Sequence, residues 1–125
     1  MAIVGIGTDI VEIARFAGQG QTNERLAQRV LTPTELEDFR ASNYGERFLA
    51  KRFAVKEAAV KAAGTGIGKG ISFQHIEVKH HESGQPFLVF SGQLQQLLSQ
   101  NGVTSSHVSL ADEQHYAVAT VILEK

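Results

Sequence analysis

Residues 47–64 form the stretch that most constrains how this chain can fold. The segment contains no proline, is rich in alanine and closes on Gly64, which predicts a long helix ended by a C-terminal glycine. At about 100° per residue, its apolar side chains cover almost the whole circumference of that helix. A helix that is apolar nearly all round is usually buried. The sequence therefore predicts one long buried helix as the centre of the domain.

Two charged residues interrupt the apolar surface of this predicted helix. Glu57 and Lys61 lie one turn apart, flanked by Phe53, Ala50 and Ala54. In general such a spacing is most often an ordinary ion pair along a helix. On a largely buried helix, however, charges are costly unless something pairs with them. We therefore interpret Glu57 and Lys61 as a pair that faces a ligand.

The composition is that of an ordinary soluble globular domain. With 42% hydrophobic residues, 20% charged residues and a net charge of −1, the chain offers no bulk attraction to nucleic acid or to an anionic membrane. No apolar run approaches the ~20 residues of a membrane span, and no signal-peptide pattern is present. Zero cysteines exclude disulfides, thiolate metal sites and cysteine nucleophiles, which fits the reducing cytoplasm. We expect one domain, residues 1–125, that self-associates and has no nucleic-acid or membrane partner.

Residues 2–11 predict a buried strand, because they are rich in β-branched residues and punctuated by glycine. Gly5 and Gly7 permit the close approach of another backbone. Asp9 is the only charge in this apolar run. Its side chain suits two roles equally, the N-cap of an element that begins near residues 11–13, or a metal ligand or general base at a strand end.

The next part of the chain, residues 12–41, has a polar and helical pattern. Residues 32–35 form a capping-box start, with proline at the first helical position, for a helix over about residues 33–41. Solvated charges are the usual outcome for arginines in such a segment, and docking of an acidic protein partner is the functional alternative. Three arginines are candidates for such a basic face: Arg15, Arg25 and Arg29.

A glycine-rich loop follows the long helix at residues 64–70. Backbone amides in such a loop can bind phosphate oxygens, and Lys69 would add positive charge. The loop follows a helix instead of a strand and lacks the Gly-Lys-Ser/Thr ending, so it is neither a Walker A sequence nor a dinucleotide fingerprint. A helix C-cap followed by a connector explains the loop equally well.

The rest of the chain predicts two β-hairpins with a short helix between them. The first hairpin joins residues 75–80 to 87–90, and the second joins residues 107–111 to 115–123. Ser91 is expected to cap the intervening helix. With hairpins dominating, we predict an α+β fold in which a mainly antiparallel sheet packs on the long buried helix.

Histidines of these hairpins give only weak site signals. His80 and His81 are adjacent in a strand pattern, so they point to opposite faces and are not expected to share a zinc ion. His107 and Ser109 share a face, but no acid lies nearby in sequence to complete a serine nucleophile. A hydrogen-bonding or phosphate-contacting role suits His107 better.

Three stretches together resemble a known family. They are residues 5–13 with Gly-Thr-Asp, residues 47–58 with Lys-Glu-Ala, and residues 107–110 with the Tyr-Ala pair at 116–117. This combination is similar to the bacterial holo-[acyl-carrier-protein] synthases, the small single-module members of the 4′-phosphopantetheinyl transferase superfamily. The resemblance covers essentially the whole chain and is loosest over residues 17–45.

The resemblance implies transfer of the 4′-phosphopantetheine arm of coenzyme A to a serine of apo acyl carrier protein, with adenosine 3′,5′-bisphosphate as the other product. Asp9 and Glu57 match the family's Mg²⁺ ligands. Lys61 would contact the phosphates and stabilise charge in the transition state. The base that takes the serine proton stays open among Glu57, Asp9 and a metal-bound water.

The resemblance also implies further contacts. Arg52 and His107 would bind the phosphates of the coenzyme. Its nucleotide end would contact a short run of the glycine-rich loop: Gly64, Thr65 and Gly66. The family resemblance implies a homotrimer with active sites between subunits, in which His107 comes from the neighbouring chain. The three arginines named above would form a basic surface for the acidic helix of the carrier protein.

Other functions compete when the residues are considered without the resemblance. A Mg²⁺-dependent phosphate-ester or pyrophosphate hydrolase then ranks close to a transferase. A non-catalytic module that binds coenzyme A or a nucleotide comes next, followed by a structural oligomer. Alanine at Asp9 or Glu57 discriminates among them, because it should abolish turnover of a metal-dependent enzyme and destabilise a structural assembly.

Overall fold

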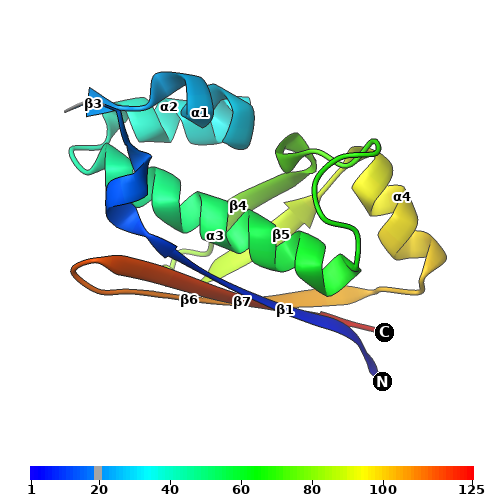
Figure 1. Ribbon diagram of the computed structural model, residues 1–125. Helices are drawn as coiled ribbons and strands as arrows, with labels where there is room; N and C mark the ends of the chain where they lie inside the picture. The colour runs from blue at the N-terminus through cyan, green and yellow to red at the C-terminus, as the bar shows by residue number, and fades with distance from the viewer. Residues whose placement is uncertain (19–20) are drawn as a thin grey trace.

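The computed structural model describes residues 1–18 and 21–125, and it shows an α+β fold built around one long helix (Figure 1). The elements in chain order are β1 (Ile3–Glu12), the 3-10 helix η1 (Ile13–Phe16), β2 (Ala17–Gly18), β3 (Gln21–Thr22), α1 (Glu24–Val30), α2 (Pro33–Ala41), α3 (Gly45–Ala63), the 3-10 helix η2 (Phe73–His75), β4 (Ile76–His80), β5 (Pro86–Phe90), α4 (Gly92–Gln100), β6 (Ser105–Asp112) and β7 (Tyr116–Glu124).

All strand pairs of the described residues are antiparallel, as predicted. The main sheet has the order β1-β7-β6, so the middle strand is the last one in the chain. In its register Asp9 of β1 lies opposite Ala119 of β7, which lies opposite Leu110 of β6. The β4–β5 hairpin forms a second small sheet, and β2 pairs with β3. These pairings confirm both predicted hairpins in the second half of the chain.

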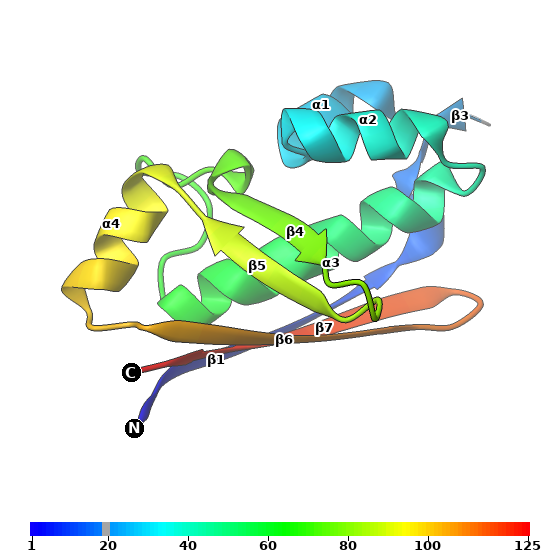
Figure 2. The ribbon, with the colours of Figure 1, turned by 180° about the vertical axis from the view of Figure 1, so that it is seen from behind.

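Helix α3 is the predicted buried helix. It ends at Gly64, whose φ of 80° gives the left-handed cap that glycine adopts at little cost. Leu49, Val55 and Val60 have at most 1% of their surface exposed. One side of α3 packs on β1 and β7, α1 and α2 lie over its N-terminal half, and the β4–β5 hairpin lies beside it (Figures 1 and 2).

Strand β1 lies against α3 through its glycines, as its sequence predicts. A Cβ atom at Gly7 would lie 2.1 Å from the carbonyl oxygen of Ala58, so only glycine allows this approach. The expectation that the strand is buried is wrong for its other face. Ile6 and Ile10 are each 63% exposed, because alternate side chains point away from the helix.

The helical pattern predicted over residues 12–41 is confirmed only from Glu24 onward. The chain continues from β1 into η1, whose Ile13 and Phe16 are buried, and regular α-helix begins only at Glu24. Burial of these two apolar side chains and the low helix propensity of glycine at position 18 explain the difference. The part of this expectation that falls on residues 19–20 lies outside the described residues.

The predicted helix starts are confirmed with one exception. Thr32 and Glu35 form the full capping box of α2, with each side chain bonded to the other residue's backbone N–H. Ser91 is the N-cap residue of α4, but its side chain makes no capping hydrogen bond. Among the described residues, no helix combines the length and the apolar character needed to cross a bilayer.

Candidate active site

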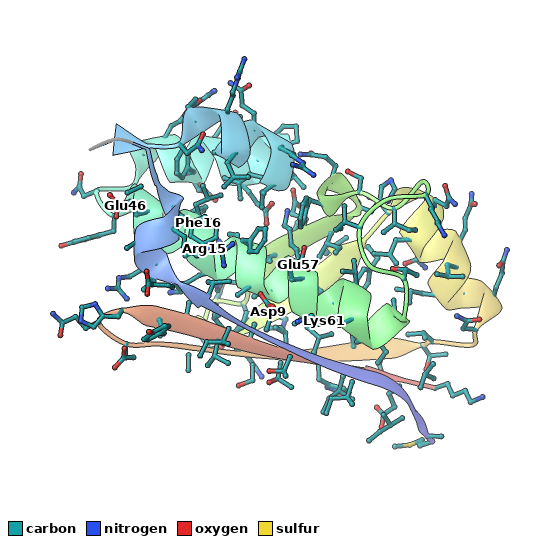
Figure 3. The ribbon with its side chains drawn as sticks, viewed as in Figure 1. Asp9, Arg15, Phe16, Glu46, Glu57 and Lys61 are labelled. Atoms are coloured by element: carbon teal, nitrogen blue, oxygen red, sulfur yellow. The ribbon has the colours of Figure 1, made fainter. Side chains whose placement is uncertain are left out.

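Asp9, Glu57 and Lys61 meet where β1 crosses α3 (Figure 3). Asp9 follows Gly7 by two residues, so its side chain is on the same face of the strand and points toward the helix. The ammonium of Lys61 donates to Asp9 Oδ1 at 2.9 Å and to the carbonyl oxygen of Thr8 at 3.1 Å. The close glycine contact between strand and helix therefore brings charged groups far apart in sequence into one centre.

Asp9 is only partly satisfied in this centre. Its side chain is 15% exposed, and its second oxygen, Oδ2, is buried without a hydrogen-bond partner among the described residues. A buried carboxylate oxygen without a partner is costly, which marks it as a position for a ligand. Asp9 lies within β1 and caps no helix, so of its two sequence interpretations the N-cap is wrong.

Glu57 lies near Asp9, and the charge of Asp9 affects the pKa of Glu57. Burial and the neighbouring Asp9 carboxylate raise the pKa of Glu57, while Lys61 acts in the opposite direction. Two carboxylates that repel each other beside an unpaired oxygen suit a divalent cation. Mg²⁺ often uses one or two protein carboxylates and completes its coordination with phosphate oxygens and water, so Asp9 and Glu57 fit it. No group of three or more such ligands occurs among the described residues.

The sequence predicts that Lys61 pairs with Glu57 on a buried surface, and the structure shows a different arrangement. Its side chain is 50% exposed, and it forms an ion pair with Asp9 on the neighbouring strand. The reason is that Gly5 and Gly7 bring β1 close to α3 without side chains of their own, so the long lysine side chain extends past the strand and reaches solvent. The ammonium is therefore free on one side to meet an anionic ligand.

Arg52 lies on another side of α3, away from this centre. It is 7% exposed, its Nε lies 3.6 Å from Glu35 Oε2, and its guanidinium carbon is 4.5 Å from the centre of the Phe48 ring. Burial lowers the pKa of Arg52, although Glu35 opposes the change. The structure does not bring Arg52 together with Asp9 and Glu57 in one chain, and its predicted phosphate contact stays a prediction.

The glycine-rich loop begins beside the centre, at the end of α3. The amides of Gly64, Thr65 and Gly66 bond back to the helix, to the carbonyl oxygens of Lys61 and Val60. They are therefore occupied as a helix C-cap and do not form the open amide cradle that the sequence suggested. Their assignment to the nucleotide end of the coenzyme stays a prediction that depends on side-chain and surface contacts.

His107 lies on β6, two strands away from β1. It pairs with Ile122, which in turn pairs with Ile6, so its side chain is on the outward face of the sheet, opposite to α3. It is exposed, and its Nε2 lies 3.1 Å from Glu124 Oε1. Within one chain, His107 and the Asp9 centre therefore lie on different faces of the sheet.

The three predicted basic residues are exposed. Arg25 and Arg29 lie one turn apart on α1. Arg15 lies on η1 next to Phe16, and Figure 3 shows it on the same side of α3 as Glu57. Along the chain, Arg15 lies between Asp9 on β1 and the two arginines of α1.

A second charged cluster was not predicted. Lys56 is completely buried and donates to Glu35 Oε1 at 2.6 Å, to the carbonyl oxygen of Val30 at 2.7 Å and to that of Phe73 at 3.2 Å. A signal was present, since Lys56 lies roughly 20° from Leu49 on a helical wheel, inside the apolar arc. Burial lowers the pKa of Lys56, and Glu35 opposes this effect.

Comparison with known proteins gives a consistent assignment. Residues 5–121 match the model of the 4′-phosphopantetheinyl transferase superfamily. The holo-[acyl-carrier-protein] synthase of Alteromonas mediterranea is 63% identical over 125 residues, covering 99% of this chain and 98% of that protein.

Solved structures agree with this match. The holo-[acyl-carrier-protein] synthase of Neisseria meningitidis superposes with a TM-score of 0.88 and 38% identity, covering 99% of this chain and all of that one. The synthase of Bacillus anthracis, solved in complex with CoA (3′,5′-ADP), gives a TM-score of 0.79 and 36% identity over 97% of this chain and 96% of that one. The chain belongs to the 4′-phosphopantetheinyl transferase superfamily, among the holo-[acyl-carrier-protein] synthases.

Proposed function

We propose that the whole chain, as a single cytoplasmic domain, transfers the 4′-phosphopantetheine arm of coenzyme A to a serine of apo acyl carrier protein. The observation that carries this proposal is the centre where β1 crosses α3. There Glu57 has a raised pKa beside Asp9, and Asp9 keeps one buried oxygen without a partner among the described residues. Membership of the 4′-phosphopantetheinyl transferase superfamily supports the assignment of this reaction to that centre.

The reaction exchanges one bond to phosphorus for another. The serine Oγ attacks the phosphorus that carries the pantetheine arm, and the bond from this phosphorus to the bridging oxygen of the pyrophosphate breaks. Adenosine 3′,5′-bisphosphate leaves with the bridging oxygen, and the serine proton passes to a base. Positioning and electrostatics supply most of the catalysis in such transfers.

The residues of the centre have distinct roles in this step. Asp9 and Glu57 would hold Mg²⁺, which when bound neutralises negative charge on the pyrophosphate. Lys61 would bind a phosphate oxygen with the part of its ammonium that faces solvent. The candidates to accept the serine proton are Glu57, Asp9 and a water bound to the metal.

A homotrimer with shared active sites is part of the proposal. Its support is the outward face of the main sheet, which exposes apolar side chains beside His107. These are Val4, Ile6, Ile10, Tyr116 and Val118. An exposed apolar face of this kind suits contact between copies of the chain. A neighbouring chain would then supply His107 to the phosphates held at Asp9 and Glu57.

Recognition of the carrier protein is assigned to the basic surface of Arg15, Arg25 and Arg29. Charges of this kind mainly speed encounter and set the register of the complex. The surface adjoins the centre through η1, which follows directly on β1. A carrier helix docked on α1 would therefore present its serine toward Glu57.

The test is the intact mass of apo acyl carrier protein incubated with this chain, coenzyme A and Mg²⁺. We expect the mass of one phosphopantetheine arm to be gained, and the gain to be lost with a chelator and in Glu57→Ala. Consumption of coenzyme A without any acceptor would instead identify a hydrolase. Absence of both reactions in a folded sample would leave a binding module.

A further inference from the structure

The backbone carbonyl groups at the C-terminal end of α1 accept hydrogen bonds from two side chains of other elements. Gln74 Nε2 on η2 donates to the carbonyl oxygen of Leu31 at 2.6 Å. It also lies 3.2 Å and 3.3 Å from the carbonyl oxygens of Arg29 and Gln28. The buried ammonium of Lys56 donates to the remaining carbonyl oxygen in this run, that of Val30, at 2.7 Å. Residues 28–31 are therefore contacted in an unbroken series.

Such contacts supply what the end of a helix lacks. The last four carbonyl groups of an α-helix have no partner within the helix. An amide has two N–H donors, so Gln74 serves Leu31 with one of them and shares the other between two carbonyls. Both donors also complement the negative end of the helix dipole, Lys56 with a full charge.

The position of α1 depends on these contacts more than that of a longer helix would. α1 has only seven residues, from Glu24 to Val30, and helices this short are not stable by themselves. Its other charged tie, between Arg40 and Glu24, joins side chains that are 53% and 48% exposed, so it contributes little. Orientation of α1 therefore comes from its buried side chains and its fastened carbonyl end.

The fastened end carries one of the arginines proposed to meet the carrier protein. Arg29 contributes one of the bonded carbonyls, and Arg25 lies one turn earlier. Lys56, which holds the same end, precedes Glu57 directly in α3. The docking surface and the reacting centre are thus tied to each other through one set of hydrogen bonds.

We propose that Gln74 is a positioning residue for carrier-protein recognition, which acts by fixing α1 against α3 together with Lys56. This inference rests on the proposed function. Among the described residues, Gln74 forms no hydrogen bond with the Asp9 centre or with the arginine side chains, so its effect passes through the backbone of α1. When that backbone moves, Arg25 and Arg29 are no longer aligned with the acidic side chains of the carrier helix.

The experiment compares Gln74→Ala and the isosteric Gln74→Glu with Gln95→Ala. Glutamate has the shape of glutamine but, when ionised, no donor, and it places a negative charge on the helix carbonyls. Gln95 is a matched control on α4, where its side chain donates to Ser99 Oγ at 3.2 Å. Steady-state rates are measured with the carrier protein varied and then with coenzyme A varied.

We expect KM for the carrier protein to rise about three- to tenfold in both Gln74 variants, as for charged contacts that lose their register. KM for coenzyme A and kcat should stay within about twofold, and Gln95→Ala should match the wild type. An unchanged KM for the carrier protein, or an equal rise for both substrates, would overturn the inference. Absence of transfer by the wild type would overturn the proposed function instead.

A double-mutant comparison isolates the route through α1. In a chain that already carries Arg25→Ala and Arg29→Ala, Gln74→Ala should raise KM for the carrier protein by much less than it does in the wild type. The same factor in both backgrounds would mean that Gln74 acts independently of the α1 surface, and the proposal would be wrong.

Discussion

The ammonium of Lys61 lies 2.9 Å from Oδ1 of Asp9, while Oδ2 of the same carboxylate is buried without a partner among the described residues. One oxygen of Asp9 is therefore held in place and the other is left for a ligand. Lys61 also lowers the pKa of Glu57, against the larger effects of burial and of Asp9. The lysine thus orients one carboxylate and keeps the second one more acidic.

Replacing Lys61 by methionine should remove both effects. The pKa of Glu57 should rise further, because the one neighbouring group that lowers it is lost. Transfer should fall by about 10²–10³ in kcat, the range found when one charge-stabilising donor is removed. The pKa is measured by NMR titration of the glutamate carboxyl carbon and kcat by intact mass. Lys79→Met, at a side chain that is 52% exposed on β4, is the control and should change neither quantity.

Glu57→Gln should separate stability from activity. The folded chain binds the Glu57 proton more tightly than the unfolded chain does, because the pKa is raised above its ordinary value of 4.5. The stability from that proton is full below pH 4.5 and is lost as pH rises through the raised pKa. Glutamine stays neutral, so at pH 7.5 without metal the variant should melt on the order of 2 °C above the wild type.

Melting curves from pH 4 to pH 8 in chelator check this expectation. The difference between Glu57→Gln and the wild type should shrink as pH falls and disappear near pH 4, where both side chains are neutral. Added Mg²⁺ should raise the melting temperature of the wild type more than that of the variant. A variant that is less stable than the wild type at pH 7.5 would show that ionised Glu57 is well paired in the fold.

Gly7→Ala should damage both the fold and the centre. The new Cβ would lie 2.1 Å from the carbonyl oxygen of Ala58 and 2.6 Å from the amide of Ala62, so β1 must move away from α3. Overpacking of this kind costs about 1–3 kcal/mol or more. The movement also separates Asp9 from Glu57, so the pKa of Glu57 should fall toward its ordinary value. Denaturant unfolding and NMR titration measure the two effects.

Gly84→Ala is the matched control for that substitution. Gly84 has a φ of 92° and open space around its Cβ position, in the β4–β5 turn. Alanine there should cost about 1–2 kcal/mol through backbone strain alone. If Gly84→Ala changed the pKa of Glu57 as much as Gly7→Ala does, the contact between β1 and α3 would not be what sets that pKa.

Much of the fold follows from local patterns in the sequence. The all-round apolar stretch predicted α3 with its end at Gly64, and the Thr32 capping box predicted the start of α2. Alternation predicted both hairpins of the second half. These features depend on neighbours in sequence, so propensity, capping and period suffice to find them.

The errors concern contacts between distant segments. Whether Lys61 pairs with Glu57 or with Asp9 depends on how β1 crosses α3, which no local pattern contains. The helical pattern of residues 12–41 does not reveal that Ile13 and Phe16 belong to a 3-10 helix in which both side chains are buried. Local pattern also does not reveal the role of Lys56, because its three acceptors come from elements before and after α3.

Mixing two inactive variants tests the shared active site. Glu57→Ala removes a residue of the centre, and His107→Ala removes the residue proposed to come from the neighbouring chain. After the two are unfolded together and refolded, about a quarter of the sites should contain both intact residues, because each site draws two chains at random. Transfer should therefore recover to about a quarter of the wild-type rate. Failure to recover, with mixed assemblies demonstrated by native mass spectrometry, would place Glu57 and His107 in the same chain's site or remove His107 from it.

Lys56→Met should be the most destabilising of these substitutions. It removes the ammonium from Glu35, which is 1% exposed, and leaves two buried carbonyl oxygens without their donor. Breaking a buried ion pair from one side costs roughly 3–5 kcal/mol, a large share of the roughly 5–15 kcal/mol that stabilises a typical domain. Urea unfolding measures the loss. Lys79→Met, which breaks only the 3.6 Å pair between a half-exposed lysine and Glu77, should cost about 1 kcal/mol or less.

The pair Glu35–Lys56 also allows a test of the cause. Glutamine at position 35 removes the charge but offers one oxygen, whereas in the wild type the N–H of Thr32 donates to Oε1 and that of Val78 to Oε2. Glu35→Gln should therefore destabilise both backgrounds, but Lys56→Met by less than the wild type, because the Lys56 partner of the carboxylate is already gone and only Arg52 remains beside it. If Glu35→Gln cost the same in both backgrounds, the loss in Lys56→Met would come from packing of the lysine stem and not from the broken ion pair.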